Sequence, residues 1–113
     1  MKLIEQPISL EELKSMAAHS FGNLVKAVID VEKEVMVVDA ELHSDEEAHL
    51  LEYGSKQKDL WGINLYPELP GKDFIEFDSV INLRPSYGNK TRSVDDPAMR
   101  EKIGRIVAKL VEK

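Results

Sequence analysis

The chain contains no cysteine. This absence excludes disulfide bonds, zinc sites with cysteine ligands and catalytic thiols. The sequence also lacks an apolar run near the ~18 residues that span a bilayer, and it lacks the cationic start and apolar stretch of a signal peptide. We therefore expect a cytoplasmic protein with no membrane partner.

Strongly basic segments are also missing. The chain has 15 Lys and Arg against 21 Asp and Glu, which gives a formal net charge of −6. An acidic chain without a basic stripe repels the phosphate backbone, so nucleic acid is not an expected partner. No P-loop, dinucleotide glycine pattern or G-x-S-x-G nucleophile motif is present, and no cofactor is expected.

At 113 residues the chain has the size of one domain, and we expect residues 1–113 to share one core. Residues 1–5 alternate like a short strand or an extended arm. Ser9-Leu-Glu-Glu12 fits a capping box, which predicts a helix from there to about Ser20. Segments 24–31 and 35–40 are rich in β-branched residues and are separated by a polar turn, as in a β-hairpin.

The second half repeats this alternation of helix and hairpin. Ser44 with Glu47 three residues later predicts the N-terminus of a middle helix, which Gly54 should end. A second hairpin is predicted from segments 59–67 and 73–85, followed by a polar loop and an amphipathic helix that Asp95 or Asp96 would cap. The predicted fold is α+β, with a four-stranded, mainly antiparallel sheet, helices on one face, and the order α-β-β-α-β-β-α.

Polar side chains interrupt the apolar pattern of the second hairpin. Side chains alternate between the faces of a strand, so Trp61, Ile63 and Leu65 should face the core. Pairing Ile63 with Phe77 keeps the apolar faces together and sets Asn64 opposite Glu76, and Gly62 opposite Asp78. The opposite face, together with the following loop, supplies the candidate binding residues Asn64, Tyr66, Glu76, Asp78, Asn82, Arg84, Asn89 and Arg92.

Ionisable side chains are densest between residues 41 and 49. Imidazole and carboxylate groups suit Zn, Mn or Fe, which makes Glu41 and His43 the candidates for a metal site. The H-E-x-x-H spacing is absent, however, so no metal is expected, and the histidines are predicted to be exposed at an acidic helix start.

These patterns favour a small ligand-binding or protein-interaction domain that uses the polar sheet face and the loop 84–93. Arg84 and Arg92 could hold a small anionic ligand, and a second copy of the chain could cover the open sheet face as a homodimer. The alternative is a small hydrolase or metal-dependent enzyme that uses Glu76, Asp78 and the Glu41/His43 segment. No nucleophile stands out, so the sequence leaves enzymatic activity undecided.

The runs Trp61-Gly-Ile-Asn-Leu-Tyr-Pro67 and Ile75-Glu-Phe-Asp-Ser-Val-Ile-Asn-Leu-Arg-Pro-Ser86 carry a resemblance over nearly the whole chain. In them the sequence resembles a family of short, uncharacterised bacterial and archaeal proteins classed as a domain of unknown function. The resemblance implies a stand-alone single domain. It implies no activity and no catalytic residue.

Overall fold

The computed structural model describes residues 1–113, which form three helices and seven strands. The helices are α1 (Leu10–His19), α2 (His43–Tyr53) and α3 (Pro97–Leu110). The strands are β1 (Lys2–Ile4), β2 (Ile8–Ser9), β3 (Val25–Asp30), β4 (Val35–Val38), β5 (Leu60–Leu65), β6 (Ile75–Glu76) and β7 (Val111–Glu112). Short 3-10 turns lie at Gln57–Asp59, Gly71–Phe74, Val80–Asn82 and Pro85–Tyr87.

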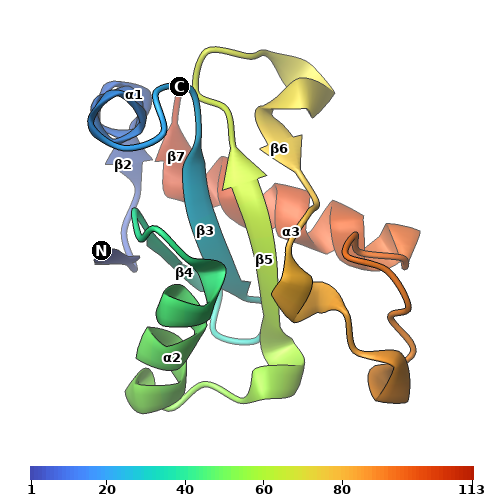
Figure 1. Ribbon diagram of the computed structural model, residues 1–113. Coiled ribbons are helices and arrows are strands. Elements are labelled where there is room, and N and C mark those ends of the chain that lie inside the picture. Colours follow the sequence, from blue (N-terminus) through green and yellow to red (C-terminus); the bar gives the residue numbers. More distant parts are fainter.

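Five strands form one antiparallel sheet in the order β1-β4-β3-β5-β6 (Figure 1). The strands β2 and β7 form a separate parallel pair. The α+β class and the mainly antiparallel sheet are therefore confirmed. The sheet has five strands instead of four because β1 pairs with β4, and β1, β2 and β7 are added to the predicted element order.

The helices cover both faces of the sheet, so the prediction of helices on one face is wrong. Figure 1 shows α2 in front of the sheet and α3 behind it. The larger core lies between the sheet and α1 and α3, and the smaller core packs Leu50 of α2 against Val28 and Val37. The reason is that β4 is apolar and buried on both faces, and Val28 gives β3 a buried apolar residue on the side of α2.

Local capping residues set most of the helix ends. The Ser9 hydroxyl accepts a hydrogen bond from the Glu12 N–H at 3.1 Å, which confirms the predicted cap of α1. Asp96 caps α3, and Gly54 ends α2 in the left-handed conformation with a φ of 109°. The predicted Ser44 cap is wrong, because α2 already begins at His43 and has no side-chain cap.

The second strand of the second hairpin, β6, is much shorter than the predicted segment 73–85. Asn64 pairs with Glu76 as expected, but β6 contains only Ile75 and Glu76. The chain then leaves the sheet, turns at Val80–Asn82, and lays Ser79 over Gly62 where Asp78 was expected. Ser79 and Asn82 are buried and bond to backbone groups, which polar side chains do more readily in turns than in strands.

The close contact between Gly62 and Ser79 predicts that a larger residue at position 62 lowers the stability of the fold. A Cβ atom at Gly62 would lie 2.5 Å from Ser79 Cβ and 3.1 Å from Ile81 Cγ1. We expect Gly62→Ala to lower the free energy of unfolding by about 2 kcal/mol, since overpacking a filled interior forces neighbours to move. Urea unfolding measures this change.

A matched control and a second variant define this experiment. Gly104→Ala adds the same methyl group where nothing lies within 4 Å, so it should not destabilise the protein. Adding Ser79→Gly to Gly62→Ala should recover part of the loss, because the two side chains no longer collide. Equal unfolding curves for Gly62→Ala and the wild type would contradict the close packing.

None of the three helices combines the length and the apolar character needed to cross a membrane.

Candidate functional site

The structure separates the candidate binding residues into two groups. Asn64, Tyr66, Glu76 and Asp78 lie together around β5 and β6, and Arg92 joins them through an ion pair with Asp78. The remaining three, Asn82, Arg84 and Asn89, bond to backbone carbonyl groups and support the chain.

Glu76 organises the first group. Its Oε1 atom accepts hydrogen bonds from Asn64 Nδ2 at 2.8 Å and from the Tyr66 hydroxyl at 3.0 Å. Partial burial and the hydrogen bond to Glu76 raise the pKa of Tyr66, which therefore stays a proton donor. The two donors share one carboxylate oxygen, so the other oxygen of Glu76 is left for solvent or a ligand.

Arg92 and Asp78 form an exposed ion pair at the border of this group. Arg92 Nε lies 2.9 Å from Asp78 Oδ1, and about half of each side chain is accessible to solvent. Such a pair adds little to stability because water screens it. The terminal nitrogens of Arg92 make no hydrogen bond in the chain and keep their donor capacity.

Lys26 lies directly opposite Asn64 in the pairing of β3 with β5. Its ammonium group lies 5.3 Å from the centre of the Phe21 ring and forms no salt bridge. The side chain is half-buried. Lys26 therefore places a cation without a carboxylate partner on the polar side of the sheet.

His43, at the first turn of α2, is buried rather than exposed, which corrects the prediction. Its Nε2 atom lies 2.7 Å from the Ile63 carbonyl oxygen. A carbonyl only accepts, so Nε2 carries the proton and Nδ1 keeps a free lone pair. Burial lowers the pKa of His43, and the charges of Lys26, Asp78 and Arg92 all act on it.

A second acceptor in this region lacks a donor. Asn64 Oδ1 is buried and has no hydrogen-bond partner, although the Nδ2 atom of the same amide is bonded. A buried polar atom without a partner costs about 1–3 kcal/mol. We call this surface the polar sheet site, which consists of Lys26, His43, Asn64, Tyr66, Glu76, Asp78 and Arg92.

The two other asparagines among the candidate binding residues hold the segment from residue 79 to residue 95. Asn82 is fully buried, accepts from the Gly62 N–H and donates to the Gly62 and Arg92 carbonyls. Asn89 Nδ2 faces three carbonyl oxygens. These amides fasten the loop against β5, so they position Arg92 without contacting a ligand themselves.

Arg84 is used internally. Its guanidinium group lies 4.3 Å from the centre of the Trp61 ring and donates to the carbonyl groups of Gln57 and Leu60. Desolvation by burial lowers the pKa of Arg84. The terminal nitrogens of Arg84 are thus directed at the chain, and its Nε atom is buried without a hydrogen-bond partner, so Arg92 is the arginine of this loop with donors free toward solvent.

The structure does not bring the acidic side chains around α2 together as a set of metal ligands. Glu41 is exposed, and no group of three or more His, Cys, Asp or Glu side chains is arranged to hold a metal ion. Glu46 is instead fully buried, with Oε2 accepting from the Ala40 N–H and Oε1 without a partner. Burial raises the pKa of Glu46 to about 9.

The sequence contained a signal for these buried groups. His43, Glu46 and Leu50 are spaced by three and four residues, so they follow one side of a helix, and Leu50 belongs to the smaller core. The prediction treated charge as a mark of exposure and therefore missed the burial of His43 and Glu46. Lys26 was also missing from the predicted binding residues.

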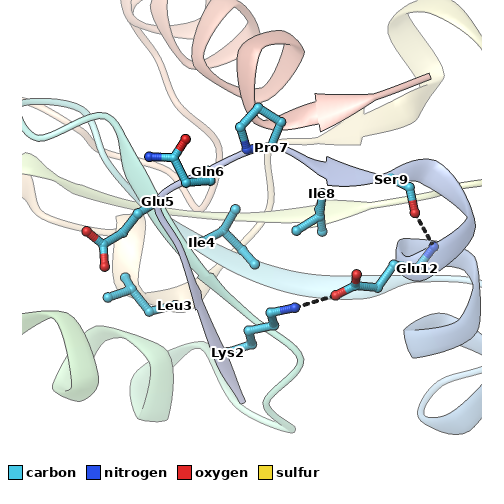
Figure 2. Close-up of a pocket in the computed structure, with 9 residues that line it drawn as sticks. All are labelled: Lys2, Leu3, Ile4, Glu5, Gln6, Pro7, Ile8, Ser9 and Glu12. Carbon is cyan, nitrogen blue, oxygen red and sulfur yellow. Dashed lines mark hydrogen bonds and ion pairs between the residues drawn. The ribbon is translucent and has the colours of Figure 1, made fainter.

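A hollow of about 490 Å³ lies elsewhere, where the chain bends between β1 and β2 (Figure 2). Its lining consists of residues 2–9 and Glu12, and Figure 2 shows the Lys2 and Glu12 side chains directed toward each other. The only cation of this hollow is thus neutralised. A short edge strand with a charged residue and a nearby Pro7 is also typical of an edge that resists pairing with other chains.

Comparison with known proteins identifies the family but no activity. A family model described as a protein of unknown function, DUF5674, matches residues 2–110. A search of curated proteins and a search of solved structures each gave no match. The family match covers almost all of the 113 residues, so the chain belongs to the DUF5674 family of proteins of unknown function.

Proposed function

We propose that the protein is a binding domain for a small anionic molecule, and that the polar sheet site holds it. The observation that carries the proposal is the buried Asn64 Oδ1 without a donor, on the residue directly opposite the unpaired Lys26. An unpaired cation and an unpaired acceptor on neighbouring strands suit a ligand with complementary groups.

The free groups of the site define the chemical class of the ligand. Lys26 and the terminal nitrogens of Arg92 suit a carboxylate. Asn64 Oδ1 and His43 Nδ1 both accept, so the ligand must also donate. The donor would lie close to Lys26, because Lys26 is opposite Asn64. A neutral donor therefore fits better than an ammonium group, which the Lys26 charge would repel. A hydroxycarboxylate combines these features.

Malate and succinate test the proposal, because they differ only in one hydroxyl group. We expect malate to shift the backbone amide NMR signals of residues around Lys26, Asn64 and Glu76 in a saturable manner. Succinate should bind at least about tenfold more weakly, since it leaves the buried acceptor unpaired. Equal affinity for the two acids would contradict the proposed role of Asn64 Oδ1.

The contribution of the Lys26 charge to malate binding is tested with two matched variants. Lys26→Met keeps the length of the apolar stem and removes the charge, and we expect about fivefold weaker malate binding. Lys58→Met makes the same change in an exposed turn away from the site and should leave the affinity unchanged. A loss of affinity in both variants would point to a general charge effect and against this site.

A hydrolase is the second candidate, and His43 is the observation that favours it. The bond to the Ile63 carbonyl and the lowered pKa leave a neutral imidazole with a lone pair on Nδ1, which is the form required of a general base. Hydrolysis of 4-nitrophenyl acetate by the wild type, lost in His43→Gln, would support this candidate. Equal rates in both proteins would reject it.

The homodimer stays a prediction, but one argument for it has changed. The sheet face that a second copy was expected to cover is closed at its centre, because Val28 is fully buried under α2. Val80 is 63% exposed and remains available to a partner. A contact between two copies would therefore use another surface, such as the loop side at Val80, and not the centre of the sheet.

A further inference from the structure

An apolar groove lies between α3 and the segment that carries β6, and the polar sheet site contributes no residue to it. Its volume is about 320 Å³. Phe74, Ile75 and Phe77 form one wall, and Gly104, Val107 and Ala108 of α3 form the other. The aromatic and aliphatic side chains of this groove continue the surface of the larger core.

Gly104 leaves space in this groove that the fold does not require. A Cβ atom at this position would meet no heavy atom within 4 Å. Alanine would therefore fit, and it favours a helix interior more than glycine does. Helix α3 thus has a glycine, which has low helix propensity, at a position where packing allows a larger side chain. The missing side chain makes the groove deeper.

The charged side chains that line the groove are of one sign. Lys72 and Lys113 are its only charged lining residues, in a chain with a net charge of −6. Neither lysine forms a salt bridge. The Lys113 ammonium group lies 3.8 Å from the centre of the Phe74 ring, so one cation is held directly above an aromatic wall.

From these features we infer that the groove binds a small amphiphilic carboxylate, with its apolar body against Ile75 and Phe77 and its anionic end at Lys72 and Lys113. The volume of about 320 Å³ is at the lower end for ligand sites, which suits a single short chain or ring. A second protein copy needs a far larger surface, about 800 Å² on each partner. An added peptide strand would find only the two residues of β6 to pair with.

Octanoate is the probe for this inference, and octylammonium is its charge-reversed control. In a backbone amide NMR titration, we expect octanoate to shift the signals of Gly104, Ile75 and Val107 in a saturable manner. Octylammonium should bind at least about tenfold more weakly, since the rim repels it. Equal affinity for the two probes would overturn the inference.

Two matched pairs of variants locate the binding. Gly104→Met fills the groove and should weaken octanoate binding at least tenfold, whereas Ala98→Met adds the same side chain on an exposed turn of α3 and should not. Lys72→Met and Lys113→Met should each weaken it about two- to fivefold, and Lys90→Met should not. Because the lysines are surface residues, they test the inference even if Gly104→Met fails to fold. Unchanged octanoate affinity in the lysine variants would overturn it.

Discussion

Asn89→Asp is expected to lower the free energy of unfolding by about 4 kcal/mol, because it breaks a buried network and sets a charge against it. Asn89 is 4% exposed, and its Nδ2 atom donates to the carbonyls of Asn82 and Ser93 at 2.7 Å and of Thr91 at 3.0 Å. A carboxylate has the same shape but no hydrogen to donate. Four oxygen atoms would then face one another in a site with little access to water.

Urea unfolding at pH 7 measures this loss, and Asn23→Asp is the matched control. Asn23 is exposed before β3 and makes no side-chain hydrogen bond, so the same substitution should change the unfolding free energy by less than about 0.5 kcal/mol. A change below about 1 kcal/mol in Asn89→Asp would show that the amide does not hold the loop.

The same variant should disturb the polar sheet site. The Ser79 N–H donates to the Arg92 carbonyl at 3.0 Å, and Asn82 donates to the same carbonyl. The Asn89 amide bonds to the carbonyls of Thr91 and Ser93, on either side of Arg92, and to that of Asn82. It therefore holds the backbone that places Arg92 beside Asp78. Loss of this order would weaken malate binding without any change in a residue of the site.

Glu46→Gln is expected to stabilise the protein by about 3 kcal/mol at pH 8 and to have little effect near pH 4.5. Burial raises the pKa of Glu46 from its usual value of 4.5 to about 9. The folded protein thus keeps a proton that the unfolded chain releases. Each pH unit between these pKa values costs up to ~1.4 kcal/mol of stability, and local relaxation around the ionised group reduces the total.

The sign of this effect gives a clear test. The stability contributed by Glu46 is fully present below pH 4.5 and is lost as the pH rises toward 9. Urea unfolding at several pH values should show wild type falling progressively below Glu46→Gln. His43 titrates in both proteins, so it cancels in the difference. Glu52→Gln, an exposed change on the same helix, should follow the wild type, and parallel curves for Glu46→Gln would contradict the raised pKa.

Short-range signals predicted the parts of the fold that depend on neighbouring residues. The Ser9 cap, the Gly54 helix end and the pairing of Asn64 with Glu76 each follow from groups close in sequence or from the alternation of faces in a strand. The prediction that the strand of segment 73–85 continues beyond Glu76 was wrong because it used only such short-range signals. Alternation does not register that the Asn82 amide finds better partners on Gly62, 20 residues away.

The sequence brought part of the candidate residues into one region, and their role in binding stays a prediction. Asn64 and Glu76 share one region because strand pairing sets them opposite each other, and hydrogen bonds and an ion pair join Tyr66, Asp78 and Arg92 to them. The Nδ2 atoms of Asn82 and Asn89 and the terminal nitrogens of Arg84 instead donate to backbone carbonyl groups. Residue type alone does not distinguish a free donor from one that is bonded within the chain.

The sequence by itself determined the α+β class, the three helices, the first hairpin and the membership of a family of unknown function. Only the tertiary structure decided which polar groups are free. Packing α2 on the sheet buries His43 and sets its tautomer, while Lys26 is left without a carboxylate and Asn64 Oδ1 without a donor. Desolvation and hydrogen bonding depend on segments far apart in the chain, so these properties arise when the two faces of the sheet are covered.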